Sequence, residues 1–275
     1  MLAVSGGGLA GCALVGEAFV APHPSRVGPP PRDVPARSVR VASGAGLPLA
    51  GWYIAGPAGA PTVVLLHGVT DSRLTMLPRA RLLRDVGFGV LIVDGRGHGE
   101  SPRERVRYGA RERLDAEATV AWVRRRRPNT RVGVVGISLG GAGAALAGER
   151  LGADAVVLES VFATLEEATD NRLRRWSGPV SHALRATLDR QADRLLGAPV
   201  DSVAPVRAVA RLGVPVFVAG GERDPFTPPA ETRRLATAAR AGVWIVPGAG
   251  HEDLFRADPA GYRTHVLAFL VGALR

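Results

Sequence analysis

The chain has 275 residues, of which 46% are hydrophobic and 22% are charged. This composition excludes a globally disordered protein, and the length suits one large α/β domain or two small ones. All 35 basic residues are arginine and the net charge is +10, which favours anionic partners. The one dense arginine run, residues 124–127, has no interleaved aromatic residues that could stack on bases. We therefore expect no nucleic acid among the partners.

The first 21 residues form a mostly apolar segment that permits several interpretations. Residues 2–21 are just long enough to span a bilayer, but Glu17 and five glycines weaken that pattern. A secretory signal would require a positively charged residue before the apolar segment, and none is present. Residues 9–12, LAGC, resemble a bacterial lipobox, in which Cys12 would be lipidated. The segment predicts a membrane-associated or exported protein, and the alternative is a cytoplasmic one.

Residues 22–36 are too rich in proline for a helix or a central strand. We expect a linker here, partly in the polyproline II conformation. The folded domain should then cover residues 37–275.

Within that domain, apolar runs alternate with segments of helical spacing. Strands are expected at 38–43, 47–54, 61–68, 89–94, 131–138, 153–160, 214–221 and 243–248, and helices at 75–86, 112–127, 140–151, 231–240 and 259–274. Such alternation predicts an α/β fold with a mainly parallel sheet of about eight strands and helices on both faces.

Residues 162–200 interrupt this alternation with a longer, arginine-rich helical stretch. It is too long for a simple connection, so we expect a small helical cap over the carboxyl edge of the sheet. Its apolar residues recur at three- and four-residue steps: Leu165, Leu173, Trp176, Val180, Leu184, Leu188, Leu195 and Leu196. This apolar face either roofs an acyl pocket or only packs against the sheet domain.

A G-x-S-x-G sequence centred on Ser138 lies where an apolar strand meets an alanine- and glycine-rich helix. This strand–turn–helix context is what a nucleophile elbow needs, because the turn forces strained backbone angles on the serine. The alternative is an ordinary serine at the N-cap of a helix. The context favours Ser138 as a nucleophile.

A nucleophilic serine needs a base and an acid that orients the base. Asp224 follows the strand at 214–221, and His251 follows the last strand, so the chain order is serine, aspartate, histidine. This is the order of the α/β-hydrolase fold. Taken singly, Asp224 could be a turn residue and His251 a surface residue. The substitute acid is Glu159, at the end of another strand.

An oxyanion hole would complete the site. Its donors would be the backbone amides of Leu139, directly after the nucleophile, and of Val69, in the loop after LLHG. Gly68 would let this loop approach the substrate, and His67 would brace it through hydrogen bonds.

Five segments, VVLLHGVTDSR, LIVDGRGHGES, VGVVGISLGG, VFVAGGERDPFTP and VPGAGHED, resemble the signature segments of the α/β-hydrolase superfamily. The resemblance covers about residues 47–270 and is closest to bacterial serine-aminopeptidase-like and monoacylglycerol-lipase-like proteins. It implies a structural role near the site for Asp94 and His98. The resemblance does not extend to a named type of cap, so the substrate stays open.

These observations predict a serine hydrolase that cleaves carboxylic esters or thioesters of a small-molecule acyl substrate through an acyl-enzyme on Ser138. No metal or cofactor is expected, and a single cysteine excludes cysteine-based metal sites. One alternative is a peptidase, in which Glu166, Glu167 and Asp170 of the cap would bind a substrate amino group. A less favoured alternative is a non-catalytic binding protein on the same scaffold.

Overall fold

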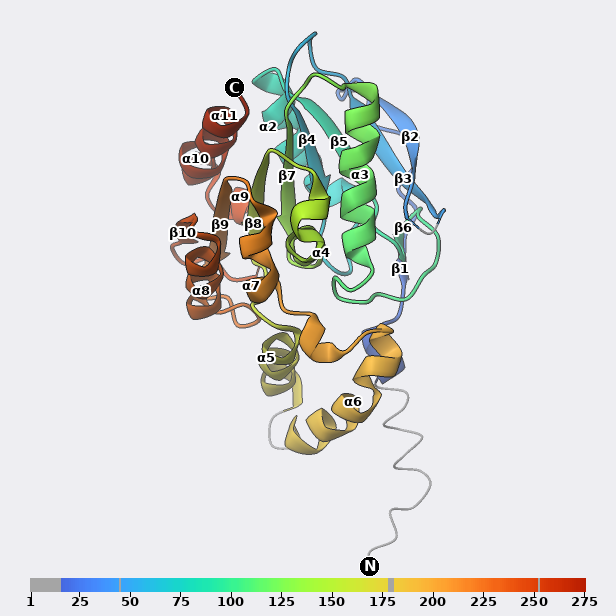
Figure 1. Cartoon of the computed structure of the whole chain (residues 1–275), viewed down its shortest axis with the longest axis vertical. Coiled ribbons are helices and arrows are strands. Elements are labelled where there is room, and N and C mark those ends of the chain that lie inside the picture. Colours follow the sequence, from blue (N-terminus) through green and yellow to red (C-terminus); the bar gives the residue numbers. More distant parts are fainter. Residues whose placement is uncertain (1–15, 45, 178–180, 252) are drawn as a thin grey trace, which may run out of the picture.

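A computed structural model describes residues 16–44, 46–177, 181–251 and 253–275, and its centre is an eight-stranded sheet (Figure 1). The strands lie in the order β10-β9-β8-β7-β4-β5-β3-β2. Their bounds are β2 (Ala36–Ala42), β3 (Pro48–Ile54), β4 (Thr62–Leu66), β5 (Gly89–Val93), β7 (Val132–Ile137), β8 (Ala155–Glu159), β9 (Val216–Gly221) and β10 (Gly242–Val246). The predicted α/β-hydrolase fold class is confirmed.

The six strands from β10 to β5 run parallel, and β3 and β2 continue the sheet in antiparallel pairing. Every residue of β4, β5 and β8 is buried, as expected of continuous apolar runs covered on both faces. The strand order reverses at β4, which lies between β5 and β7. Open α/β sheets bind ligands beyond the carboxyl ends of the strands at such a switch point.

Helices cover both faces of the sheet (Figure 1). One face carries α3 (Glu112–Arg126), α4 (Leu139–Ala147) and α8 (Pro229–Ala239), whose apolar residues join one buried cluster. The other face carries α2 (Leu77–Asp85), α9 (Leu254–Ala257), α10 (Pro259–Tyr262) and α11 (Ala268–Leu274). The helix expected at 259–274 is interrupted by a π-helical turn at Arg263–Leu267, between α10 and α11.

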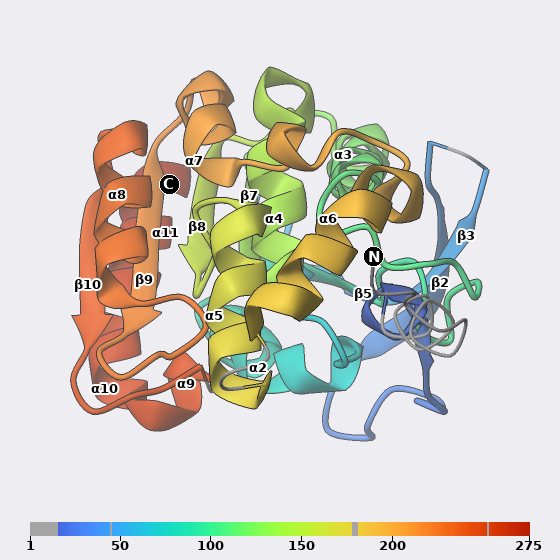
Figure 2. The same ribbon diagram turned by 90° about the horizontal axis from the view of Figure 1, so that it is seen from below.

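Two cap helices, α5 (Leu165–Ser177) and α6 (Ser181–Leu196), lie between β8 and β9 in the chain and beyond the end of the sheet in space (Figures 1 and 2). Arg185 of α6 links them through ion pairs with Asp170 and Glu166 of α5. Leu165, Leu173, Leu188, Leu195 and Leu196 are buried. The side chains of Trp176, Val180 and Leu184 lie outside the described part of the structure.

Residues 16–20 form one wall beneath this cap. Residues 16–19 are helical, and Gly16 lies so close to α6 that an added Cβ would come within 2.7 Å of Leu195 Cδ1. The carbonyl oxygens of Phe19 and Val20 accept hydrogen bonds from the Tyr108 hydroxyl and the Val106 amide, at 2.7 and 2.9 Å. Cys12 and the rest of residues 1–15 lie outside the described residues, so the interpretation of residues 1–21 stays a prediction. None of the helices within the described ranges is long and apolar enough to cross a membrane.

The segment expected to be a linker is attached to the domain. β1 (His23–Pro24) pairs in parallel with β6 (His98–Gly99), and the amides of Val27 and Gly28 donate to the Glu100 carboxylate at 3.2 and 2.9 Å. The prolines leave enough backbone donors and acceptors for this short pairing. The contacts of the domain therefore reach N-terminal to Ala36, into the segment for which composition predicted a linker.

A buried ion pair joins α2 to the end of β8. The Arg79 guanidinium lies 2.5 Å from Glu159 Oε2, both side chains are 1% exposed, and the Tyr262 hydroxyl donates to Glu159 Oε1 at 2.6 Å. Buried charges are tolerated only when they are paired and hydrogen-bonded. This pair therefore fixes α2 and the C-terminal helices to the sheet.

We expect Arg79→Met to lower the free energy of unfolding by about 3–5 kcal/mol, because Glu159 would be left buried without its cation. Arg81→Met is the matched control on the same helix, since Arg81 pairs with Asp33 at the surface and such pairs contribute about 0–1 kcal/mol. Urea denaturation of both variants measures the difference. Equal, small losses would show that the Arg79–Glu159 pair does not hold α2 in place.

Candidate active site

Ser138 lies at the sharp turn between β7 and α4, at the carboxyl edge of the sheet. Its backbone has φ 46° and ψ −108°, a conformation that is strained for any residue with a Cβ. The side chain is almost fully buried, and the Ser138 amide donates to the Glu159 carbonyl at 2.8 Å. The surrounding chain therefore holds the serine in a conformation that it would not adopt by itself.

The two glycines of the G-x-S-x-G sequence are required by close backbone contacts. A Cβ on Gly136 would lie 2.5 Å from Gly141 Cα, and one on Gly140 would lie 2.6 Å from the Leu66 carbonyl oxygen. The Gly140 amide also donates to the His67 carbonyl at 3.1 Å. The first turn of α4 is thus pressed against the end of β4, which brings the loop after β4 next to Ser138.

Asp224 and His251 meet in the loops after β9 and β10. His251 Nδ1 lies 2.7 Å from Asp224 Oδ2, and Asp224 Oδ1 accepts the amides of Phe226 and Thr227 at 2.8 and 2.9 Å. Burial alone would raise the pKa of Asp224, but the hydrogen bonds from His251 and Thr227 outweigh it and hold that pKa below its usual value. The carboxylate therefore stays ionised and orients the imidazole.

A cavity of about 620 Å³ joins Ser138, His251 and Val69. Asp224 lies behind His251, away from the cavity. No hydrogen bond between Ser138 and His251 is present in the described residues. Hydrogen bonds of this kind often form only when substrate is bound.

One of the two predicted amide donors belongs to Val69, which lines this cavity. The other belongs to Leu139, which provides the first amide of α4, directly after Ser138. Neither amide has a hydrogen-bond partner among the described residues, and the N-terminal amides of a helix are not used within the helix. Both donors are therefore available to a ligand atom.

His67 braces the loop that carries Val69, as expected. Its Nδ1 lies 2.7 Å from the Gly68 carbonyl, and its Nε2 accepts the Gly95 amide at 3.0 Å, so the neutral ring carries its proton on Nδ1. Burial, with the neighbouring His98, lowers the pKa of His67 to about 3. Because the ring is neutral and both nitrogens are engaged in hydrogen bonds, His67 holds the loop and is not available for proton transfer with a substrate.

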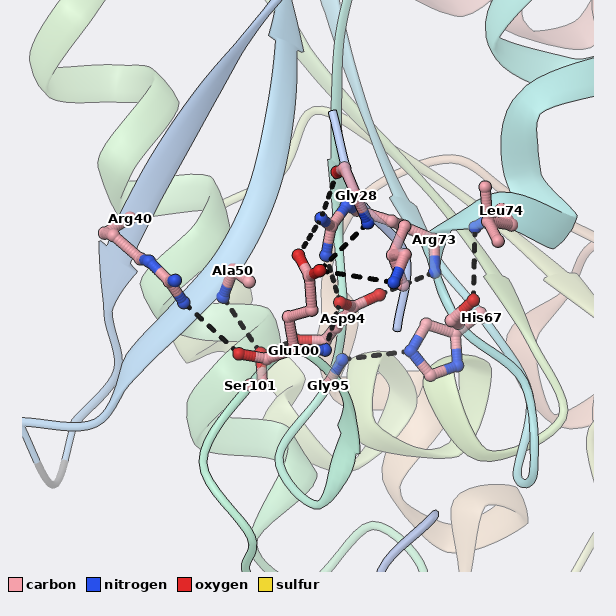
Figure 3. A network of polar contacts seen from close by, with 12 residues as sticks. Gly28, Arg40, Ala50, His67, Arg73, Leu74, Asp94, Gly95, Glu100 and Ser101 are labelled. Carbon is pink, nitrogen blue, oxygen red and sulfur yellow. Dashed lines mark hydrogen bonds and ion pairs between the residues drawn. The ribbon is translucent and has the colours of Figure 1, made fainter. Parts of the chain in front are cut away.

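A buried polar network that the sequence did not predict supports the same loop (Figure 3). The Arg73 amide donates to Asp94 Oδ1 at 2.7 Å, and its guanidinium pairs with Asp94 and with Glu100, the latter at 2.6 Å. The Arg73 guanidinium also donates to the Gly28 carbonyl at 3.3 Å. The network links β5, the loop after β4 and the N-terminal segment, which gives Asp94 the structural role that the resemblance implied.

The other predicted carboxylates are engaged elsewhere. Glu159 is paired with Arg79 and Tyr262 and is therefore not the partner of His251. In the cap, Glu167 pairs with Arg234, and Asp170 and Glu166 pair with Arg185. The described ranges contain no cluster of three or more side chains suited to holding a metal ion.

Comparison with known proteins identifies relatives over most of the chain. A sequence model of the Alpha/beta hydrolase family matches residues 63–264. YqkD of Bacillus subtilis (strain 168) is 28% identical, covering 84% of this chain and 77% of that protein. Protein ABHD12B of Homo sapiens is 31% identical, covering 69% of this chain and 53% of its own length.

Solved structures share the fold. The esterase Pf2001 of Pyrococcus furiosus has a TM-score of 0.76 at 23% identity, covering 94% of this chain and 100% of that one. The acylaminoacyl peptidase of Pyrococcus horikoshii has a TM-score of 0.64 at 17% identity, covering 87% of this chain and 41% of that one. At these identities the likeness concerns the fold alone.

We expect Gly140→Ala to lower the free energy of unfolding by about 1–3 kcal/mol, because its methyl group would overlap the β4 carbonyls. Gly68→Ala is the matched control, since its methyl group would lie 3.6 Å from Ser138 Cβ, in ordinary contact. Thermal denaturation of the two variants checks this difference. A Gly140→Ala protein as stable as Gly68→Ala would mean that α4 does not depend on this close contact.

Proposed function

Because the chain belongs to the alpha/beta hydrolase family, we propose that it is a serine hydrolase that cleaves carboxylic esters or thioesters of a small-molecule substrate. The observation that carries the proposal is the Asp224–His251 hydrogen bond of 2.7 Å behind a cavity that His251 and Ser138 both line. A strained serine, a histidine and a buried carboxylate on successive loops are the components of acyl transfer. The esterase among the structural neighbours has the same fold.

In the proposed reaction, Ser138 Oγ attacks the carbonyl carbon while His251 Nε2 takes the hydroxyl proton. The amides of Leu139 and Val69 donate hydrogen bonds to the oxyanion of the tetrahedral intermediate. When the intermediate collapses, His251 gives its proton to the departing alkoxide or thiolate, which leaves an acyl ester on Ser138. A water molecule, deprotonated by His251, then attacks that ester, and His251 returns the proton to Ser138 Oγ as the acid is released.

Asp224 contributes by stabilising the imidazolium that forms in both steps. The depressed pKa of Asp224 keeps it charged throughout. Its two backbone hydrogen bonds, from Phe226 and Thr227, keep the carboxylate facing His251 Nδ1. The proton therefore enters and leaves at His251 Nε2.

Ester or thioester cleavage is favoured over the peptidase alternative by the cap. A peptidase that binds a free amino group needs an available carboxylate, but Glu166, Glu167 and Asp170 are already paired with arginines. The apolar residues of the same helices enclose a second, smaller cavity of about 60 Å³.

We expect Ser138→Ala to reduce hydrolysis of 4-nitrophenyl esters by roughly four to six decades, because the nucleophile is removed. The fold should be retained, because the Ser138 side chain does not contribute to packing of the core. Steady-state kinetics and labelling by a fluorophosphonate probe measure the loss. Turnover close to that of the wild type, or undiminished labelling, would reject Ser138 as the nucleophile.

We expect Asp224→Asn to lower turnover by about 10⁴-fold while the protein stays folded, because an amide cannot stabilise the imidazolium. Glu159→Gln is the comparison, and it should lower stability through the unbalanced charge of Arg79 with a much smaller direct effect on the chemical step. Single-turnover kinetics at equal folded fractions separates the two. A mild Asp224→Asn together with a severe Glu159→Gln would reverse the assignment of the acid.

A further inference from the structure

Four arginine side chains are buried within the described residues: Arg73, Arg79, Arg96 and Arg172. Arg73, Arg79 and Arg96 each pair with a buried carboxylate, from Asp94, Glu159 and Asp115 respectively. This is the usual arrangement, because a buried guanidinium without a counter-charge is costly. Arg172 departs from it.

Arg172 has no carboxylate within 4.0 Å in the part of the chain that the structure describes. The residue is 8% exposed, and its hydrogen bond goes to the Ala168 carbonyl of its own helix at 3.1 Å. The guanidinium lies 5.4 Å from the centre of the Phe226 ring. Burial lowers the pKa of Arg172, and the more distant Tyr108, Asp224 and Glu231 oppose that effect only in part. Among the described residues, the cation is thus desolvated without a carboxylate in direct contact.

Arg172, which has no carboxylate partner among the described residues, lies at the candidate active site. The side chain lines the cavity that contains Ser138 and His251. On its other side it lines the small apolar cavity between α5, α6 and residues 16–20. A ligand in the larger cavity can therefore contact both Ser138 and the Arg172 side chain.

We propose that Arg172 is a specificity-determining residue that binds an anionic group, a carboxylate or a phosphate, on the ester that Ser138 attacks. The inference rests on the proposed function, because it names the substrate class of the same site. The planar fork of arginine donates two parallel hydrogen bonds to either oxyanion. The substrate thus provides the counter-charge that the protein provides for Arg73, Arg79 and Arg96.

The other charges of the cavity are compatible with an anion at Arg172. Asp253 is paired with Arg79 at 2.7 Å, and Arg256 adds an exposed positive charge. Burial, together with the nearby Asp253, raises the pKa of Asp71, and His251 opposes this in part. Of the two carboxylates that line this cavity, Asp71 and Asp253, only Asp71 has no ion pair among the described residues. The ligand's charge should therefore lie away from Asp71, at the cap helix, and its carbonyl at Ser138.

The kinetic test compares three 4-nitrophenyl esters of matched acyl length that end in a methyl, a carboxylate or a phosphate group. Arg172→Gln should lower kcat/KM for an anionic ester about 10- to 100-fold, chiefly through KM, and change that for the methyl-terminated ester less than about threefold. Arg175→Gln is the matched control, because Arg175 is exposed on the same helix and its loss removes the same charge. The anionic ester whose kcat/KM falls more in Arg172→Gln identifies whether Arg172 binds a carboxylate or a phosphate.

A binding test does not depend on the chemistry. Isothermal titration of Ser138→Ala with glutarate, and separately with phenyl phosphate, should give saturable binding that is at least tenfold weaker in Ser138→Ala/Arg172→Gln. Should Arg172→Gln fail to fold, Arg172→Lys keeps the charge but loses the fork, and it should show a smaller loss in both tests.

Two outcomes would overturn the inference. Equal losses on neutral and anionic esters would mean that Arg172 only positions Phe226 and the Asp224 loop. Equal effects of Arg172→Gln and Arg175→Gln would mean that the general positive charge attracts the anion. If the wild type hydrolyses none of the esters but the titrations behave as expected, the proposed function fails and the anion site stands.

Discussion

The contact between the end of β4 and the first turn of α4 is the constraint on which the site depends. Gly140 lets two backbone segments lie closer than any side chain would permit, and the His67 carbonyl accepts the Gly140 amide across that contact. The same approach brings the loop after β4 next to the first turn of α4, which begins at Leu139. The strain at Ser138 is held by the strands on either side of β7.

Around this contact, buried ion pairs connect the elements that apolar packing connects elsewhere in the sheet. Arg79 ties α2 to β8, Arg73 ties the loop after β4 to β5, and Arg96 ties the loop after β5 to α3. Each pair joins elements that are distant in sequence. If one partner is removed, the other is left as a buried charge without a counter-charge. The loops that surround the cavity are therefore held by directional contacts, which fix orientation as well as distance.

The alternation of apolar runs was enough to predict the sheet and the order of its elements, because strands buried on both faces leave a continuous apolar signature. Ser138 and His251 followed from their places after such strands. Glu159 ends a strand and Asp224 follows one, and only their partners across the fold distinguish them. Asp224 contacts His251, whereas Glu159 is paired with Arg79, 80 residues earlier in the chain. The attachment of residues 23–28 and the burial of Arg172 could not be predicted either. Both depend on contacts across the fold, which leave no local pattern in the sequence.

Because residues 16–20 contact the cap, the cap cannot be transferred to another hydrolase core as residues 162–200 alone without losing part of its surroundings. The small cavity under α5 and α6 takes part of its wall from Gly16, Phe19 and Val20, more than 140 residues earlier in the chain. The cap insertion is therefore not a self-contained module, although it is continuous in sequence. A chimera that received only residues 162–200 on another hydrolase core would expose the underside of α6, whereas one that also received residues 16–20 would keep this part of the cavity wall.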